Sequence, residues 1–269
     1  MNVSIRPAAV AGAFYPDSAP ALENTVSLML MKAPRGVSFS PKAIIVPHAG
    51  YIYSGPIAAC VYAPLRKLRD TVERVVLLGP THRVAVNGLA LPSCKAFTTP
   101  LGDIPVDQQA VAAIEGLPQI VFSDAAHAQE HSLEVQLPFL QIVLGEFSLL
   151  PLAVGEASPS AVAEVIERLW GGEETLIVVS SDLSHYLPYD SARQTDERTA
   201  QHILDLDPTI HHQQACGASP VNGLLLAARK HGLHAQLIDL RNSGDTAGDK
   251  ARVVGYGAFA FHEVEHHAH

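Results

Sequence analysis

Apolar runs that alternate with helix-like patterns organise most of this chain. Short runs rich in Val, Ile and Leu predict buried β-strands over residues 42–47, 73–78 and 175–179. Between the first two runs, residues 56–68 carry apolar side chains at helical spacing, which predicts a β-α-β unit. The two strands of such a unit are expected to be parallel and joined by a right-handed crossover.

The same alternation continues toward the end of the chain. Further helices are predicted over residues 107–115, 131–144, 158–170, 191–206 and 220–230, and further strands over 148–154, 235–240 and 252–261. Pro138 lies inside the second of these helices and predicts a kink or an early break there. The whole pattern predicts the α/β class, with a parallel-rich central sheet flanked by helices.

The chain shows no sign of a second domain. It contains no sequence repeat, low-complexity linker or change of composition. We therefore expect a single α/β domain over residues 1–262. The end of the chain, HEVEHHAH, is rich in histidine and follows the last predicted strand. We expect residues 263–269 to be a disordered tail that takes no part in a site.

Composition narrows the classes of function. Hydrophobic residues make up 48% of the chain and aromatic residues only 6%, so the core must be mostly aliphatic. The net charge of -9 argues against nucleic acid and anionic membranes as partners. No apolar run approaches the roughly 20 residues of a membrane span, and the chain does not start like a signal peptide. With three cysteines and no CxxC pair, a cytoplasmic protein is expected.

Three of the predicted strand ends are followed by a histidine. The runs IIVP, VVLLGP and LIVVSSD lead into His48, His82 and His185, respectively. Loops at the carboxyl ends of parallel strands converge on one crevice, where ligands bind. Neutral imidazole is a common metal ligand, and Asp182 could bind the metal or orient a ring. Each histidine alone could be an ordinary loop residue, but the three together predict a shared metal site.

A further cluster lies in the segment HAQEHSLEVQ. His127, Glu130 and His131 match the H-x-x-E-H pattern of a class of zinc peptidases. That interpretation leaves the three strand-end histidines without a role. A second interpretation places Glu130 and His131 in the wall of the same crevice, and a third treats them as helix-capping residues. Phosphate-binding loops and a G-x-S-x-G nucleophile motif are both missing from the sequence.

Taken together, the motifs resemble those of the Memo family, whose bacterial members are known as AmmeMemoRadiSam system protein B. The resemblance extends over nearly the whole chain, in the family's order. It is carried by RPAAVAGAFYP at 6–16, VPHAGYIYSG at 46–55, LLGPTHR at 77–83, EHSLEVQLPFL at 130–140, SSDLSHY at 180–186, and NSGD and VVGYGAF between 242 and 259.

The resemblance implies a fold similar to that of the class III extradiol dioxygenases, which are non-haem iron enzymes. It also implies that His48 and His82 bind the metal and that His185 acts as an acid/base group. The eukaryotic relative has a cysteine as a further ligand, near the position of Ser243, Gly244 and Asp245. This chain has no cysteine there. Asp245 is proposed to replace it, and two histidines with one carboxylate form a ligand set associated with Fe(II).

These expectations lead to a functional hypothesis with alternatives. The first is a metal-dependent oxidoreductase that uses Fe(II), with zinc or copper as other candidate metals, and with His185, Asp182, Glu130 and His131 as catalytic residues. The second is a module that binds a peptide or partner protein in the same crevice without catalysis, and the third is metal-assisted hydrolysis. The ligand is expected to be a small molecule or a peptide. The family resemblance further implies association with radical-SAM and AMMECR-type proteins.

Overall fold

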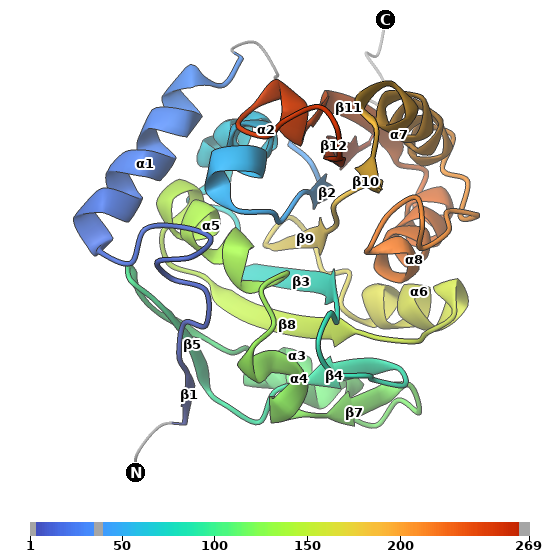
Figure 1. The fold of residues 1–269 in the computed structure, drawn as a ribbon. Helices are drawn as coiled ribbons and strands as arrows, with labels where there is room; N and C mark the ends of the chain where they lie inside the picture. Colours follow the sequence, from blue (N-terminus) through green and yellow to red (C-terminus); the bar gives the residue numbers. More distant parts are fainter. Residues whose placement is uncertain (1–3, 35–39, 264–269) are drawn as a thin grey trace, which may run out of the picture.

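A nine-stranded mixed sheet forms the centre of the protein (Figure 1). The structure is a computed structural model that describes residues 4–34 and 40–263. The strand order is β10-β12-β2-β9-β3-β8-β4-β7, and β11 pairs with β12. The strands are β2 (Ala43–Val46), β3 (Arg74–Pro80), β4 (Leu89–Leu91), β7 (Ile120–Phe122), β8 (Ser148–Val154), β9 (Thr175–Ser180), β10 (His185–Leu187), β11 (His234–Asn242) and β12 (Val253–His262).

Helices cover both faces of this sheet. One side carries α1 (Ala19–Lys32), α2 (Tyr51–Tyr62) and α5 (Leu137–Leu144), and the other carries α6 (Pro159–Arg168) and α8 (Ala218–Lys230) (Figure 1). Helix α7 (Tyr189–Leu204) packs against β11 and β12. The remaining helical segments are α3 (Gln108–Ile114), α4 (Asp124–Ala128) and the 3₁₀ turns η1 (Ala63–Leu68), η2 (Glu134–Gln136) and η3 (Ser243–Asp245).

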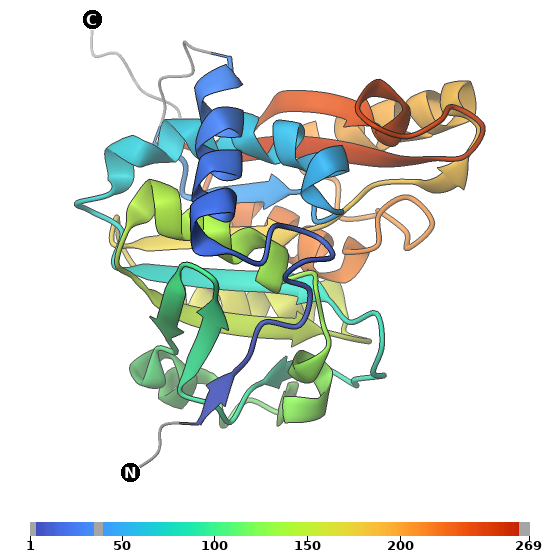
Figure 2. The same cartoon turned by 60° about the vertical axis from the view of Figure 1, so that its left-hand side comes forward.

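A second, small sheet consists of β1 (Ile5–Arg6), β5 (Ala96–Thr99) and β6 (Gly102–Pro105). Figure 2 brings it to the front, below α1. Strand β5 pairs with β1 in parallel and with β6 as an antiparallel hairpin. This sheet therefore fastens the start of the chain to its middle.

The four central strands β2, β9, β3 and β8 are mutually parallel. Every residue of β2 and β9 is buried. This double-sided burial explains why the two strands appear in the sequence as continuous aliphatic runs. It also confirms the predicted α/β class with a parallel-rich sheet. Because the four strands run the same way, their carboxyl ends lie along one edge.

The predicted β-α-β unit is present, with one difference in strand order. Strands β2 and β3 are parallel as expected, but β9 lies between them and pairs with both. The loops after β2 and β3, which carry His48 and His82, are thus not immediate neighbours. The segment that follows β9 enters the gap between them.

Several helix boundaries differ from the predictions. Helix α6 starts as predicted, with the Ser158 hydroxyl accepting a hydrogen bond from the Ala161 amide. Helix α2 begins at Tyr51, five residues before the predicted start, and contains Pro56. The helix predicted from residue 131 begins as the turn η2 and becomes α-helical at Leu137, so that Pro138 lies in its first turn and causes no kink. Helices α1 and α4 and strands β1, β4, β5, β6, β7 and β10 were not predicted.

Two further expectations concern the ends of the chain and the membrane. The predicted tail of residues 263–269 falls, except for Glu263, outside the described residues. Within residues 4–34 and 40–263, no helix has both the length and the apolar character needed to span a membrane.

A buried ion pair connects the start of the chain to the turn η2. The Arg6 guanidinium pairs with the Glu134 carboxylate, and both side chains are almost fully buried. Arg6 also donates hydrogen bonds to two carbonyls, those of His127 at 2.9 Å and Glu130 at 2.7 Å. Glu134 accepts further bonds from the Ala9 amide, the Val10 amide and the Tyr15 hydroxyl. Each buried charge is therefore paired and hydrogen-bonded.

We predict that Arg6→Ala lowers the free energy of unfolding by about 3–5 kcal/mol, because it leaves the Glu134 charge buried and unpaired. Urea titration followed by circular dichroism measures this loss. The matched control is Arg193→Ala, which removes an exposed pair with Glu197 on α7 and should cost only about 0.3–0.5 kcal/mol. Similar losses in both variants would contradict the prediction.

Candidate metal centre

Three histidines from separate segments meet at the carboxyl edge of the sheet. His48 follows β2, His82 follows β3, and His131 lies between α4 and η2. One ligand atom from each ring lies within 4.8 Å of the other two. Two imidazole nitrogens bound to one metal ion are at most about 4.2 Å apart, so a small inward movement would let the three share an ion.

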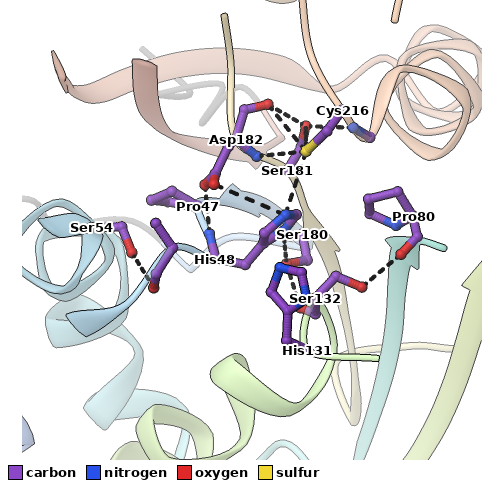
Figure 3. Close-up of polar contacts among 12 residues, drawn as sticks. Pro47, His48, Ser54, Pro80, His131, Ser132, Ser180, Ser181, Asp182 and Cys216 are labelled. Carbon is purple, nitrogen blue, oxygen red and sulfur yellow. Dashed lines mark hydrogen bonds and ion pairs between the residues drawn. The ribbon is translucent and has the colours of Figure 1, made fainter. Parts of the chain in front are cut away.

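Strand β9 and its loop hold His48 in place. The His48 amide donates to Asp182 Oδ1 at 2.7 Å, and His48 Nδ1 lies 2.9 Å from the Ser180 hydroxyl. Figure 3 shows Asp182 and Cys216 above the His48 ring, and Ser132 and His131 below it. With its amide and Nδ1 both engaged, His48 has only Nε2 left to bind a metal.

Glu130 fixes the second histidine. Its carboxylate accepts hydrogen bonds from His82 Nδ1 at 2.9 Å and from the His82 amide at 2.6 Å. Burial opposes ionisation of Glu130, but the bonds from His82 and the Ser132 amide outweigh it and lower the pKa of Glu130 to about 2. An ionised carboxylate can only accept, so Nδ1 of His82 carries a proton and Nε2 is the ring nitrogen left to bind a metal. Histidines that bind metals commonly donate to a carboxylate in this way.

His131 completes the group from a segment that packs closely on β3. Gly79, near the end of β3, makes this approach possible, because a Cβ there would lie 2.9 Å from Ser132 Oγ. The Ser132 hydroxyl donates to the Pro80 carbonyl at 2.8 Å. The His131 ring stacks on His82, with centroids 4.6 Å apart, and Phe14 lies against it at 4.7 Å.

The electrostatic surroundings favour neutral imidazoles. Burial lowers the pKa of His48 well below its usual value and, together with His82, lowers the pKa of His131 to about 4. Both rings are therefore neutral near pH 7, which is the form that binds metals. The side chains are 2% exposed for His48, 19% for His131 and 28% for His82, so the group opens to solvent on the His82 side.

Cys216 is a site residue that the sequence analysis missed. Its sulfur lies 3.4 Å from His48 Nε2 and accepts a hydrogen bond from the Asp182 amide at 3.3 Å. Burial raises the pKa of its thiol to about 12. Cys216 lies two residues before α8 and follows no strand, so the search for histidines at strand ends did not select it. The segment around Ser243 holds no cysteine, and the thiol beside His48 comes from the segment before α8 instead.

Asp182 and His185 occupy the β9 loop beside the group. Asp182 Oδ2 lies 4.0 Å from His48 Nε2, and burial raises the pKa of Asp182 to about 7. His185 Nδ1 donates to the Leu183 carbonyl at 2.8 Å, which leaves Nε2 with a lone pair. His185 is half-buried and interacts electrostatically with His48 and His82. It is not part of the three-histidine group, and its role in proton transfer stays a prediction.

The structure does not bring Asp245 into the group, which corrects the proposed ligand set. Asp245 is exposed, and its carboxylate accepts from the Asn242 amide at 3.0 Å and the Tyr189 hydroxyl at 2.6 Å. The physical reason is a capping box that closes η3 locally. His127 is also elsewhere, with Nε2 donating to the Ala90 carbonyl at 2.9 Å, so His127 and His131 do not form a zinc-peptidase pair.

A buried carboxyl group supports the loop that carries His185. Asp196 on α7 accepts a hydrogen bond from the Ser184 amide at 2.9 Å. Its carboxyl group packs over Gly255 of β12, where a Cβ would come within 2.0 Å of Asp196 Oδ2. Burial raises the pKa of Asp196 to about 6 despite the bond from the Ser184 amide.

Comparisons with known proteins agree on one family. The model described as Memo-like protein matches residues 6–260. A MEMO1 family protein from Aquifex aeolicus is 38% identical over 270 residues, covering 96% of this chain and 99% of that protein. Another from Ignicoccus hospitalis is 35% identical over 284 residues, covering 96% and 98%.

A likeness to a solved structure concerns the fold alone. The crystal structure of an uncharacterized protein from Escherichia coli K12 has a TM-score of 0.52 at 13% sequence identity. It covers 80% of this chain and 98% of that chain.

We predict that Asp196→Asn stabilises the protein more at pH 7 than at pH 4. The carboxyl group of Asp196 has a raised pKa in the folded state, so its favourable contribution is complete below about pH 3.8 and is lost as the pH rises through about 6. The unfolding free energy of the variant relative to wild type should increase by about 3 kcal/mol across this range. Urea titrations at both pH values measure it, and a constant difference would show that Asp196 ionises normally.

Proposed function

The chain belongs to the Memo family, and from this premise we propose that it is a metal-dependent oxidoreductase with a non-haem iron site. His48, His82 and His131 are the proposed ligands. The observation that carries the proposal is the convergence of their ligand atoms within 4.8 Å at the carboxyl edge of the parallel strands. The donor set suits a divalent first-row metal, because all three donors are imidazoles.

The residues around the group prepare it for chemistry. Fe(II) held by these residues would supply one-electron chemistry with O₂. His185 accepts a proton from the substrate, because its Nδ1–H is committed to the Leu183 carbonyl and its Nε2 is free to act as a base. Asp182 holds the backbone of His48 and so keeps the loop after β2 against β9.

The proximity of Cys216 favours a softer donor in the same site. At 3.4 Å from His48 Nε2, its sulfur is close enough to share a metal with that ring, since Zn–S and Zn–N bonds are about 2.3 and 2.1 Å. A thiolate strengthens the binding of zinc, copper(I) and iron. We therefore include Cys216 as a further ligand in the proposal.

Zinc-assisted hydrolysis is the second candidate function. The observation that favours it is the three-histidine set itself, which with one open position also suits zinc-bound water. The two functions differ in the metal that restores activity. A binding module without catalysis is the remaining alternative, and protein that binds no metal would support it.

We predict that His48→Ala and His131→Ala each lower the affinity for Fe²⁺ by at least about 100-fold, because each removes a direct ligand; losses of about 10–100-fold are typical even for outer-shell partners. His185→Ala and Asp245→Ala should bind Fe²⁺ like the wild type. Anaerobic titration followed by metal analysis measures the affinities in protein that ends at residue 262, which excludes the histidines of the tail.

Two outcomes would contradict this ligand set. Retention of iron by His131→Ala would remove the third histidine from the set. Loss of iron in Asp245→Ala, in a variant with an unchanged circular dichroism spectrum, would restore the carboxylate ligand expected from the sequence. Iron bound at a ratio well below one per chain in the wild-type protein would favour the binding module.

We predict that cobalt-substituted protein shows a thiolate-to-metal charge-transfer band that Cys216→Ser removes. The band requires a bond between sulfur and the metal, so it distinguishes a ligand from a neighbouring thiol. Cys60→Ser is the matched control, since Cys60 is buried in α2 and hydrogen-bonds to Asp239. A wild-type spectrum without this band would show that Cys216 only packs beside His48.

A further inference from the structure

We propose that Gln136 and Ser180 are positioning residues that hold His48 in the tautomer protonated on Nδ1 and thereby reserve Nε2 for the metal. That Nε2 is kept for a metal rests on the proposed function. The tautomer itself is a property of the metal-free chain, because protein groups alone determine it.

Two backbone carbonyls set the direction of the hydrogen bonds. A carbonyl oxygen can only accept, so any group bonded to the Pro47 or Ser132 carbonyl must donate. The side-chain atom of Gln136 that lies 2.9 Å from the Pro47 carbonyl is therefore the amide nitrogen. The other side-chain atom is then the oxygen, which accepts from the Tyr62 hydroxyl at 2.9 Å.

The Ser180 hydroxyl is constrained in the same way. It lies 2.7 Å from the Ser132 carbonyl and must donate its only proton there. The amide nitrogen of Gln136, at 2.8 Å, donates to the Ser180 oxygen. His48 Nδ1 lies 2.9 Å from that same oxygen, which has no further proton to offer. Nδ1 must therefore carry a proton and donate it to Ser180, whose side chain lies beside the His48 ring in Figure 3.

Burial makes this network rigid. Gln136, Ser180 and Tyr62 are all 0% exposed, and Tyr62 stacks on Phe139 with centroids 5.0 Å apart. Water therefore has no access to replace a broken bond, and a reversed tautomer would leave the Ser180 oxygen facing the Nδ1 lone pair. An unsatisfied buried group of this kind is costly. His48 is consequently held with an unprotonated Nε2, the nitrogen that lies 3.4 Å from Cys216 Sγ.

This role differs from that of Glu130, which fixes His82 by charge. Gln136 and Ser180 are neutral, and they act through the direction of their bonds. The two arrangements converge on the same result, since His82 and His48 both carry the proton on Nδ1 and present Nε2.

Long-range ¹H–¹⁵N NMR of the metal-free protein, ending at residue 262, tests the proposal. The signals of His48 are identified by their loss in His48→Gln. In wild type, Nδ1 of His48 should appear protonated and Nε2 unprotonated. In Ser180→Ala the two tautomers should both be populated, and the affinity for Zn²⁺ should fall about 10–100-fold, as expected when an outer-shell partner of a ligand is removed.

The controls distinguish loss of the hydrogen bond between His48 and Ser180 from a general disturbance of the fold. Ser132→Ala removes the bond to the Pro80 carbonyl but keeps the Ser132 carbonyl that accepts from Ser180, so the tautomer of His48 should remain unchanged. Gln136→Leu is a second test that leaves Ser180 in place, and it should also populate both tautomers. Thermal unfolding confirms that each variant is folded.

Distinct results would overturn the two parts of the proposal. Wild-type His48 protonated on Nε2 refutes it without any variant, and so does an unchanged tautomer in both Ser180→Ala and Gln136→Leu. If wild-type His48 has the expected tautomer but the chain binds neither Zn²⁺ nor Fe²⁺, the positioning of the ring is confirmed. In that case Nε2 is not kept for a metal, and the proposed function is wrong.

Discussion

The carboxylate of Glu134 accepts hydrogen bonds from two backbone amides, a tyrosine hydroxyl and the guanidinium of Arg6, and all of this takes place out of contact with water. A charge in that position is tolerated only when its partners surround it. The chain between Arg6 and Tyr15 must therefore wrap around η2. That wrapping brings Phe14 against His131 and holds the segment of His131 on β3. The third histidine of the site thus depends on an ion pair that does not touch the metal group.

The site combines an aliphatic sheet with a polar edge. Strands β2 and β9 are buried along their whole length, and polar side chains begin only where these strands end. At that edge, burial keeps the histidines neutral, and Glu130 keeps its charge because several N–H groups point at it. Because the imidazoles are neutral and an anion lies nearby, a divalent cation can bind in this poorly hydrated region without repulsion from protonated histidines. The His82 side stays open, so a substrate can approach from solvent.

The proposed choice of metal depends on the sulfur of Cys216 and on the imidazoles of His48 and His82. Imidazole suits iron, zinc and copper alike, so the histidines alone discriminate weakly. A thiol beside His48 Nε2 adds a soft donor, whereas the carboxylate of Asp245 is engaged in its own capping box. For this reason we propose a nitrogen- and sulfur-rich ligand set in place of the set of two histidines and one carboxylate inferred from the sequence.

Part of this site could be read directly from the sequence. Continuous aliphatic runs are predictable because burial on both faces of a parallel sheet leaves no room for polar residues, and His48 and His82 follow such runs. His131 and Cys216 follow no strand, and only their packing against Gly79 and Asp182 brings them to the group. Asp245 has a carboxylate that could bind a metal, but this carboxylate accepts a local hydrogen bond from the Asn242 amide instead. The sequence by itself determined which strands end in imidazoles, because that depends on neighbouring residues. Tertiary structure decided which side chains complete the group, because that depends on contacts between segments as far apart as His48 and Cys216.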